Sequence, residues 1–161
     1  MTIEPIDNVR NVDLGDEVII LDPNLLSFND ATLDKFNENL SLYYDYFSSK
    51  SAKAESIQAI AEMDYDTIYF TKFAEAKAEG ISDKGADAMA KVSPTVIEAN
   101  KSAINAKYNN RQIKEYLKAY DKTHDMAKAR QYQRGKEADK FGSDNYYKKE
   151  INVDDILSSN D

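Results

Sequence analysis

Residues 93–134, SPTVIEANKSAINAKYNNRQIKEYLKAYDKTHDMAKARQYQR, decide the fold of this chain. Ser93 and Pro94 place an N-cap before a proline at the first helical position, which together signal the start of a helix. No proline or glycine follows until Gly135. The sequence therefore predicts one helix over 94–134, about 60 Å long at 1.5 Å per residue.

Apolar and small residues recur along this helix at every third or fourth position, which is the spacing of a coiled-coil seam. The members of this seam are Val96, Ala99, Ala103, Ala106, Asn110, Ile113, Leu117, Tyr120, His124 and Ala127. A polar seam residue such as Asn110 commonly sets the register of a coiled coil. A two-helix hairpin cannot cover its own apolar stripe, so the seam predicts an interface between copies of the chain. We expect that interface to use Val96, Ala103, Asn110, Ile113, Leu117, Tyr120 and His124.

Two further helices are predicted before residue 80. Apolar residues at helical spacing follow Asn29 or Asp30, either of which is a good N-cap, and they predict a helix over 30–48. The serines of 48–51 are expected to interrupt or bend it. A second helix is predicted over 51–79, with Gly80 directly after its end. One or two helical turns follow over 86–92.

The fold class expected from these elements is all-α, an elongated helical hairpin of long coiled-coil-like helices. Only five glycines and three prolines occur in 161 residues, so little turn chemistry is available. Residues 1–28 are expected to be an irregular N-terminal segment. Its apolar stretch 17–22, EVIILD, is read as a short extended piece without a pairing partner. Residues 29–140 then form the helical domain, and residues 141–161 an acidic flexible tail that either docks on a partner or only adds solubility.

Charge is sorted along the chain. Residues 1–90 hold 7 Lys or Arg against 18 Asp or Glu, whereas residues 91–140 hold 12 against 6, within a net charge of −8. A basic block inside an acidic protein indicates that the chain meets both a polyanion and other proteins. Positions 107, 111, 114, 118 and 122 follow one helical stripe. The residues of this block that we expect to bind DNA, with one interleaved tyrosine, are Lys101, Lys107, Tyr108, Arg111, Lys114, Lys118, Lys128, Arg130 and Arg134.

Two explanations of the basic block remain open. Basic side chains that track phosphates, with aromatic residues that stack on bases, are typical of sequence-neutral single-strand binding. The same lysines would instead be structural if they pair with the acidic second helix across the hairpin.

Nothing in the sequence resembles a catalytic or cofactor site. There is no cysteine, His124 is the only histidine, and phosphate-binding, zinc-protease and serine-hydrolase motifs do not occur. Asp121 and Asp125 lie one turn apart but are best explained as a solvated helix face. We expect no enzyme activity, no cofactor and no metal. The longest apolar run is residues 18–21 and no secretory signal precedes it, so we also expect a soluble, cytoplasmic protein without a membrane segment.

With the helices placed, the order of features resembles the UvsY-type recombination mediators of T4-like phages. The likeness lies in residues 17–22, then Leu25 and Leu26, a helix through LYY at 42–44, and a second helix rich in charged residues. The end of the long helix, DMA at 125–127 followed by RQYQRGK at 130–136, is also similar. The resemblance covers residues 16–137 and consists of spacing and residue type.

The resemblance implies a small helical protein that assembles into a ring, binds single-stranded DNA and helps a recombinase replace single-strand-binding protein. If the chain is phage-encoded, it would act in the host cytoplasm. The family's basic DNA-contacting positions lie just before the glycine turn, where this chain has KFAEAKAEG over 72–80. Lys72 matches the first position. Ala74 stands at the second, so Lys77 is the nearest substitute.

Two other functions are weighed against a recombination mediator. The chain is alternatively a non-enzymatic protein-binding module, an assembly adaptor or an inhibitor of a host factor, that uses its acidic face and tail. It is otherwise a purely structural coiled-coil oligomer.

Overall fold

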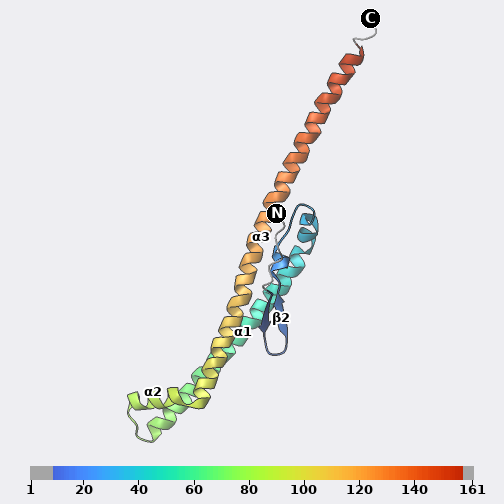
Figure 1. Cartoon of the computed structure of the whole chain (residues 1–161). Helices are drawn as coiled ribbons and strands as arrows, with labels where there is room; N and C mark the ends of the chain where they lie inside the picture. The colour runs from blue at the N-terminus through green and yellow to red at the C-terminus, as the bar shows by residue number, and fades with distance from the viewer. Residues whose placement is uncertain (1–8, 158–161) are drawn as a thin grey trace.

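The protein is an elongated helical hairpin, as predicted. A computed structural model of the chain describes the backbone of residues 9–157 and the side chains of residues 9–140. Two long helices, α1 (Leu33–Ala78) and α3 (Pro94–Leu157), run side by side and are joined at one end by α2 (Asp83–Val92) (Figure 1). The all-α fold class is thereby confirmed.

α1 is one continuous helix of 46 residues, so the predicted interruption at 48–51 is wrong. Ser49 donates from its Oγ to the carbonyl oxygen of Tyr46 within the helix, at 2.7 Å. Ser51 is buried. Helix propensities differ by under 1 kcal/mol for such residues, so tertiary packing outweighs the serine signal. α1 also begins at Leu33 after Thr32, later than the predicted cap at Asn29 or Asp30.

Both predicted helix boundaries around α2 are confirmed. Gly80 has a φ of 81°, the left-handed conformation that a C′ glycine adopts without steric cost. Its N–H donates to the carbonyl oxygen of Lys77, and the N–H of Ile81 donates to that of Ala76, which closes the end of α1. α3 begins at Pro94, and the N–H of Ile97 donates to the carbonyl oxygen of Ser93.

The N-terminal segment contains a β-hairpin that the sequence did not predict. β1 (Arg10–Asp13) pairs antiparallel with β2 (Val18–Leu21) through a turn at Gly15, whose φ is 92°. The expectation that residues 17–22 have no pairing partner is therefore wrong. A short 3-10 helix, η1 (Pro23–Leu26), leads from the hairpin toward α1.

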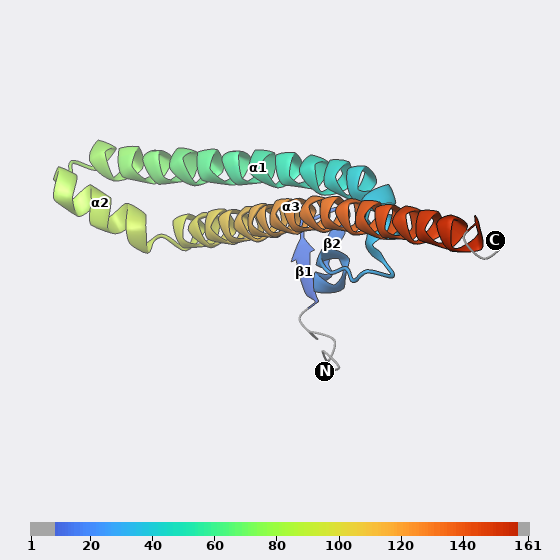
Figure 2. The same cartoon turned by 90° about the horizontal axis from the view of Figure 1, so that it is seen from above.

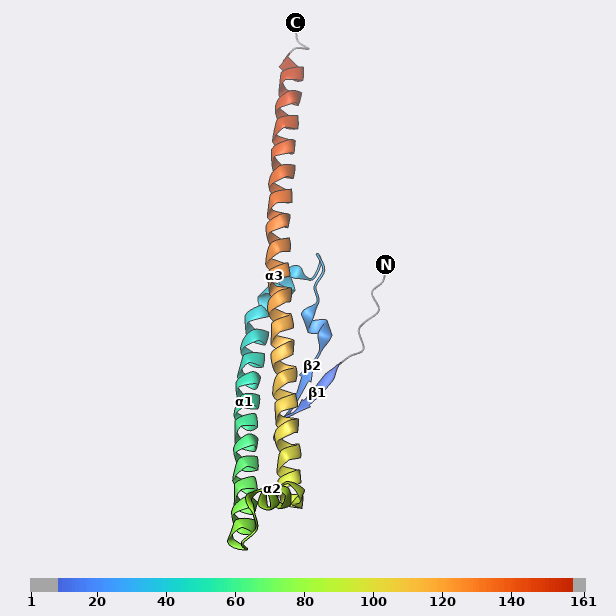
Figure 3. The same ribbon diagram turned by 90° about the vertical axis from the view of Figure 1, so that its left-hand side faces the viewer.

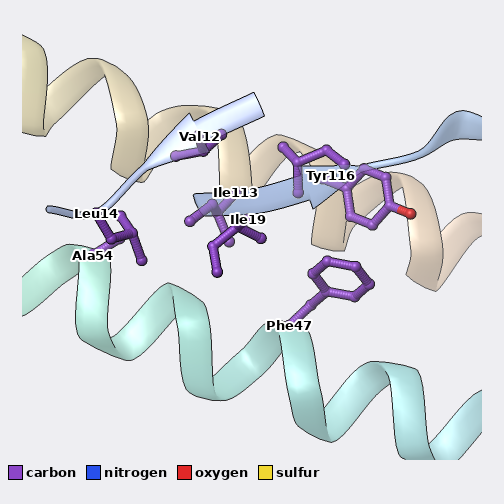
Figure 4. Packing of buried hydrophobic residues seen from close by; sticks show 8 residues of the cluster. Val12, Leu14, Ile19, Phe47, Ala54, Ile113 and Tyr116 are labelled. Atoms are coloured by element: carbon purple, nitrogen blue, oxygen red, sulfur yellow. The ribbon is translucent and has the colours of Figure 1, made fainter. Parts of the chain in front are cut away.

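The hairpin packs on one side of the two-helix layer and completes the hydrophobic core (Figure 2). Alternate residues of the strands point inward, so Val12 and Ile19 are fully buried while Val18 and Ile20 face outward. Figure 4 shows Val12 and Ile19 beside Ile113 of α3, with Phe47 of α1 below them. The main cluster comprises Val12, Leu14, Ile19, Leu21, Phe47, Ala54, Ile113 and Tyr116. The thin helical pair therefore obtains its core from a third element of the same chain.

α3 runs to Leu157, so the predicted helix end near residue 134 is wrong. Glycine costs a helix about 1 kcal/mol relative to alanine, and neither Gly135 nor Gly142 ends this one. α3 consequently projects far beyond the start of α1 (Figure 3). The helix covers most of the segment expected to be a flexible tail. Residues 158–161 of that tail, and residues 1–8 of the N-terminal segment, lie outside the described residues.

Candidate nucleic-acid interface

Most of the basic residues between positions 107 and 128 of α3 lie on the side of the helix that the β-hairpin leaves open. The hairpin side of α3 is fixed by three hydrogen bonds from side chains of the helix. Asn109 donates to the carbonyl oxygen of Asp13 at 2.7 Å, Tyr116 to that of Asp22 at 2.8 Å, and Thr123 to that of Leu26 at 3.2 Å. At 100° per residue, positions 107, 114, 118 and 122 face away from these three.

Two members of the predicted stripe are held by carboxylates of the same chain. Arg111 contacts Glu115 one turn along α3, with Nε 2.7 Å from the carboxylate. The arginine lowers the pKa of Glu115 by this hydrogen bond and by its charge. Lys114 reaches across to Glu55 of α1 at 3.1 Å. Lys114 is therefore the member of the stripe for which the alternative of pairing across the hairpin is correct.

Arg130 and Arg134 hold the start of α1 against α3. Arg130 makes a two-point contact with Asp30, at 2.6 Å and 2.8 Å, and Arg134 lies 3.3 Å from Asp34. The hydrogen bond from Arg130 lowers the pKa of the Asp30 carboxyl and raises that of the guanidinium. Their ion pairs join the segment that leads into α1, and the first turn of α1, to α3. That these two arginines bind DNA stays a prediction.

Lys72 and Lys77 are also paired, at the opposite end of the molecule. Lys72 contacts Glu75 at 2.7 Å within α1. Lys77 contacts Asp83 of α2 at 2.6 Å, and its Nζ donates to the carbonyl oxygen of Ile81 at 3.2 Å. Lys77 thus stabilises the turn between α1 and α2. The two positions taken from the family resemblance are not part of the α3 surface.

Four exposed lysines remain on the open side of α3, and we call Lys107, Lys118, Lys122 and Lys128 the basic face. None of them makes an ion pair within the described part of the chain, and the same is true of Lys101. They extend over about 32 Å of helix at 1.5 Å per residue. Tyr108 is 62% exposed beside them. Asp121 and Asp125 lie between the lysines and reduce the positive potential of the face.

The seam residues are buried within one chain. Val96, Ala103, Asn110, Ile113 and Tyr120 are all at most 8% exposed, and Leu117 and His124 are partly buried. This corrects the expectation that they face a second copy, because α1 and the hairpin of the same chain cover them.

Polar seam residues bind α1 directly. Asn110 donates from Nδ2 to Oε1 of Gln58 at 2.6 Å, and the Tyr120 hydroxyl donates to the carbonyl oxygen of Leu40 at 3.1 Å. Burial raises the pKa of Tyr120 to about 12. These bonds give the pair of long helices a defined register.

The turn of the β-hairpin is held to α1 by a cluster of ion pairs that the sequence did not predict. Lys53 lies 2.7 Å from both Asp16 and Glu17, and Lys50 lies 2.6 Å from Glu17. Hydrogen bonds from these lysines lower the pKa of both carboxyls. Spacing along the chain gives no signal for such pairs, since their members are more than 30 residues apart.

An apolar groove lies between α1 and α3 below the hairpin, and sequence reasoning missed it too. The lower groove has a volume of about 580 Å³. Its lining residues are Ile57, Ile60, Ala61, Asp64 and Ile68 from α1 and Thr95, Glu98, Ala99 and Ser102 from α3. A sequence signal for the groove was present: the apolar residues of α1 continue at helical spacing over 57–68, beyond Ile57, which packs against the core under the β-hairpin.

Comparison with protein-family models, with curated proteins and with solved structures returns no significant match. Among residues 9–157, no helix has an apolar stretch that would reach across a bilayer. Over the same residues, no group of three or more His, Asp or Glu side chains is placed to hold a metal ion. The exposed surfaces of the two long helices are therefore the candidate binding sites of the protein.

Proposed function

We propose that this protein is a non-enzymatic binding protein for single-stranded DNA and acts as a recombination mediator. The observation that carries DNA binding is the basic face: four unpaired lysines along one side of α3, in a chain whose net charge is −8. Holding these like charges together without direct ion pairs costs free energy. A bound polyanion offsets this cost, and the counterions that it releases favour binding further.

A flexible single strand suits this surface better than a duplex does. The lysines lie along α3, which is a long, nearly straight helix (Figure 3), so an extended strand could follow them one after another. Tyr132 is 66% exposed on α3, with Lys136 4.6 Å from its ring centre, so an aromatic surface for stacking is present beyond the lysines. The mediator role is supported by the resemblance to UvsY-type proteins. This role implies an oligomer that contacts a recombinase and single-strand-binding protein.

The test is fluorescence anisotropy of a labelled oligothymidine against the purified protein, at low and near-physiological salt. The charge-reversal variant Lys118→Glu/Lys122→Glu is expected to weaken binding at least tenfold. Its matched control is Lys35→Glu/Lys84→Glu, which changes the net charge equally at two exposed lysines outside the basic face. Equal losses in both variants would show that only net charge matters, and the basic face would have no special role.

The mediator role has a separate test. The protein is added to a recombinase and an oligonucleotide that is already covered by single-strand-binding protein, and the recombinase bound to DNA is measured. We expect more bound recombinase with the protein than without it. DNA binding without this increase would restrict the function to single-strand binding. An absence of binding even at low salt would favour the protein-binding module.

A further inference from the structure

The groove between α1 and α3 is filled by the β-hairpin along only part of its length. Beside the upper part, the hairpin inserts Val12 and Ile19, both fully buried. Ile57 packs against that cluster and also lines the lower groove, so the groove continues the same apolar surface. Beyond this point nothing in residues 9–140 covers it, and Ile60 is 52% exposed. The lower groove is therefore an unfilled continuation of the core.

The shape and charge of the lower groove specify what would fill it. Its α1 wall presents Ile57, Ile60, Ala61 and Ile68 over about 16 Å, or three turns of helix. The small alanine in this wall allows another helix to approach closely. Asp64 lines the same wall and Glu98 the other, and neither makes an ion pair within the described residues. A complementary helix would carry apolar residues flanked by basic ones.

α3 itself presents such a surface on its outward side. Ile97 is 41% exposed, Ile104 58% and Tyr108 62%, and helical spacing places them on one stripe with Lys101 and Arg111. We call these five residues the outer stripe. The stripe lies opposite the buried seam, so α1 does not cover it. Large apolar side chains exposed in a row generally mark an interaction surface.

We infer that the lower groove of one copy binds the outer stripe of α3 from a second copy. The isoleucines and Tyr108 of the stripe would pack against the apolar wall, while Lys101, which makes no ion pair within the described residues, would meet the carboxylates of Asp64 and Glu98. Arg111 already contacts Glu115, so it adds positive charge to the stripe without being an unpaired cation. This inference deepens the oligomeric part of the proposed function and does not depend on DNA. It also places Lys101 and Tyr108, which the sequence assigned to DNA, at a contact between copies.

The two surfaces differ and lie on different sides of α3, so the contact is heterologous. Each copy then offers a groove to one neighbour and a stripe to the other, which produces a closed ring or an open chain of copies. An asymmetric dimer would leave one groove and one stripe unused, and a symmetric dimer would require both groove–stripe contacts to form at once. The arrangement therefore predicts assemblies larger than a dimer.

The experiment is mass measurement by light scattering and sedimentation, without DNA, on the full chain of 18.2 kDa. We compare the wild type with the groove variant Ile60→Glu and the stripe variant Ile104→Glu. Both residues are more than half exposed, so neither substitution should unfold the chain, and circular dichroism checks this. Each variant alone is expected to be monomeric, with association weakened at least about 30-fold. The control is Met126→Glu, on the same outward side of α3 and 64% exposed, which should keep the wild-type mass.

Mixing the two variants gives the decisive result. The Ile60→Glu copy retains its stripe and the Ile104→Glu copy retains its groove, so the mixture should form one-to-one dimers and nothing larger. A monomeric wild type would overturn the inference and leave the groove to another protein. Wild-type mass in either variant alone, or a mixture that stays monomeric, would overturn it as well. Loss of DNA binding by the basic-face variant, with its mass unchanged, would support the DNA-binding proposal and would show that the basic face is not part of the contact between copies.

Discussion

The salt dependence of DNA binding tests the division of the lysines into paired and unpaired groups. Replacing Lys118 and Lys122 by glutamine removes half of the four lysines of the basic face without adding negative charge. For single strands, the slope of log K against log salt is about −0.7 for each phosphate neutralised. Four contacts predict a slope of about −2.8, and two predict about −1.4.

These slopes convert into affinities that a titration resolves easily. Between 50 and 200 mM salt the wild type should lose about 50-fold in affinity, whereas the double variant should lose about sevenfold. The measurement is anisotropy of a labelled oligothymidine at five or six salt concentrations, with the slope fitted for each protein. The comparison is reliable because slopes do not depend on the fraction of active protein in each preparation.

Lys72→Gln/Lys77→Gln provides the control for this experiment. Both lysines already contact carboxylates, at 2.7 Å and 2.6 Å, so their removal should leave the slope near that of the wild type. If the control lowers the slope by about 1.4 and the basic-face variant does not, our assignment is refuted. DNA would then bind at the turn between α1 and α2, at the positions that the family resemblance indicated.

Three further predictions follow from packing and charge. Phe47→Ala should lower the free energy of unfolding, measured in urea, by about 3–5 kcal/mol because it opens a cavity in the main core cluster. The control is Phe70→Ala, at a residue that is 63% exposed, which should lower it by under about 0.5 kcal/mol. Lys53→Met should lower Tm at neutral pH but not at pH 2. Its partners Asp16 and Glu17 have lowered pKa values in the folded state. The ion pairs therefore stabilise the fold above about pH 4.5, and this stabilisation is lost as pH falls further. An equal Tm difference at both pH values would contradict this. Asp121→Asn/Asp125→Asn should tighten oligothymidine binding roughly fivefold by removing repulsion of phosphate, and unchanged anisotropy curves would place the strand elsewhere.

The helices could be predicted because their signals are local. Ser93 with Pro94, and Gly80 after α1, act through the conformation of a few neighbouring residues, and both boundaries are confirmed. The seam of α3 was found from its periodicity, since residues three and four apart share one face of a helix. Most seam residues are buried, as this periodicity indicates.

The β-hairpin was missed because β1 has the polar sequence RNVD, in which only Val12 faces the core. A two-stranded hairpin is marginal in water, so its stability depends on packing against α1 and α3. The available signal was Gly15-Asp16 between VDL and EVIIL, a dipeptide that is typical of tight turns between strands. The serines at 48–51 misled for a related reason: α1 continues through them and Ser51 is buried, so tertiary packing overrides their low helix propensity.

The sequence by itself determined the helical character of the chain, the turn before α3 and the phase of the seam, because each depends on residues within a few turns of one another. It did not determine that residues 33–78 form one continuous helix. Only the tertiary structure decided what covers the seam and which cations are free. Arg130 meets Asp30, and Lys114 meets Glu55, across 100 and 59 positions. Such pairs form only when the chain folds back on itself. The surfaces that remain unpaired after folding, the basic face and the lower groove, therefore could not be read from residue spacing alone.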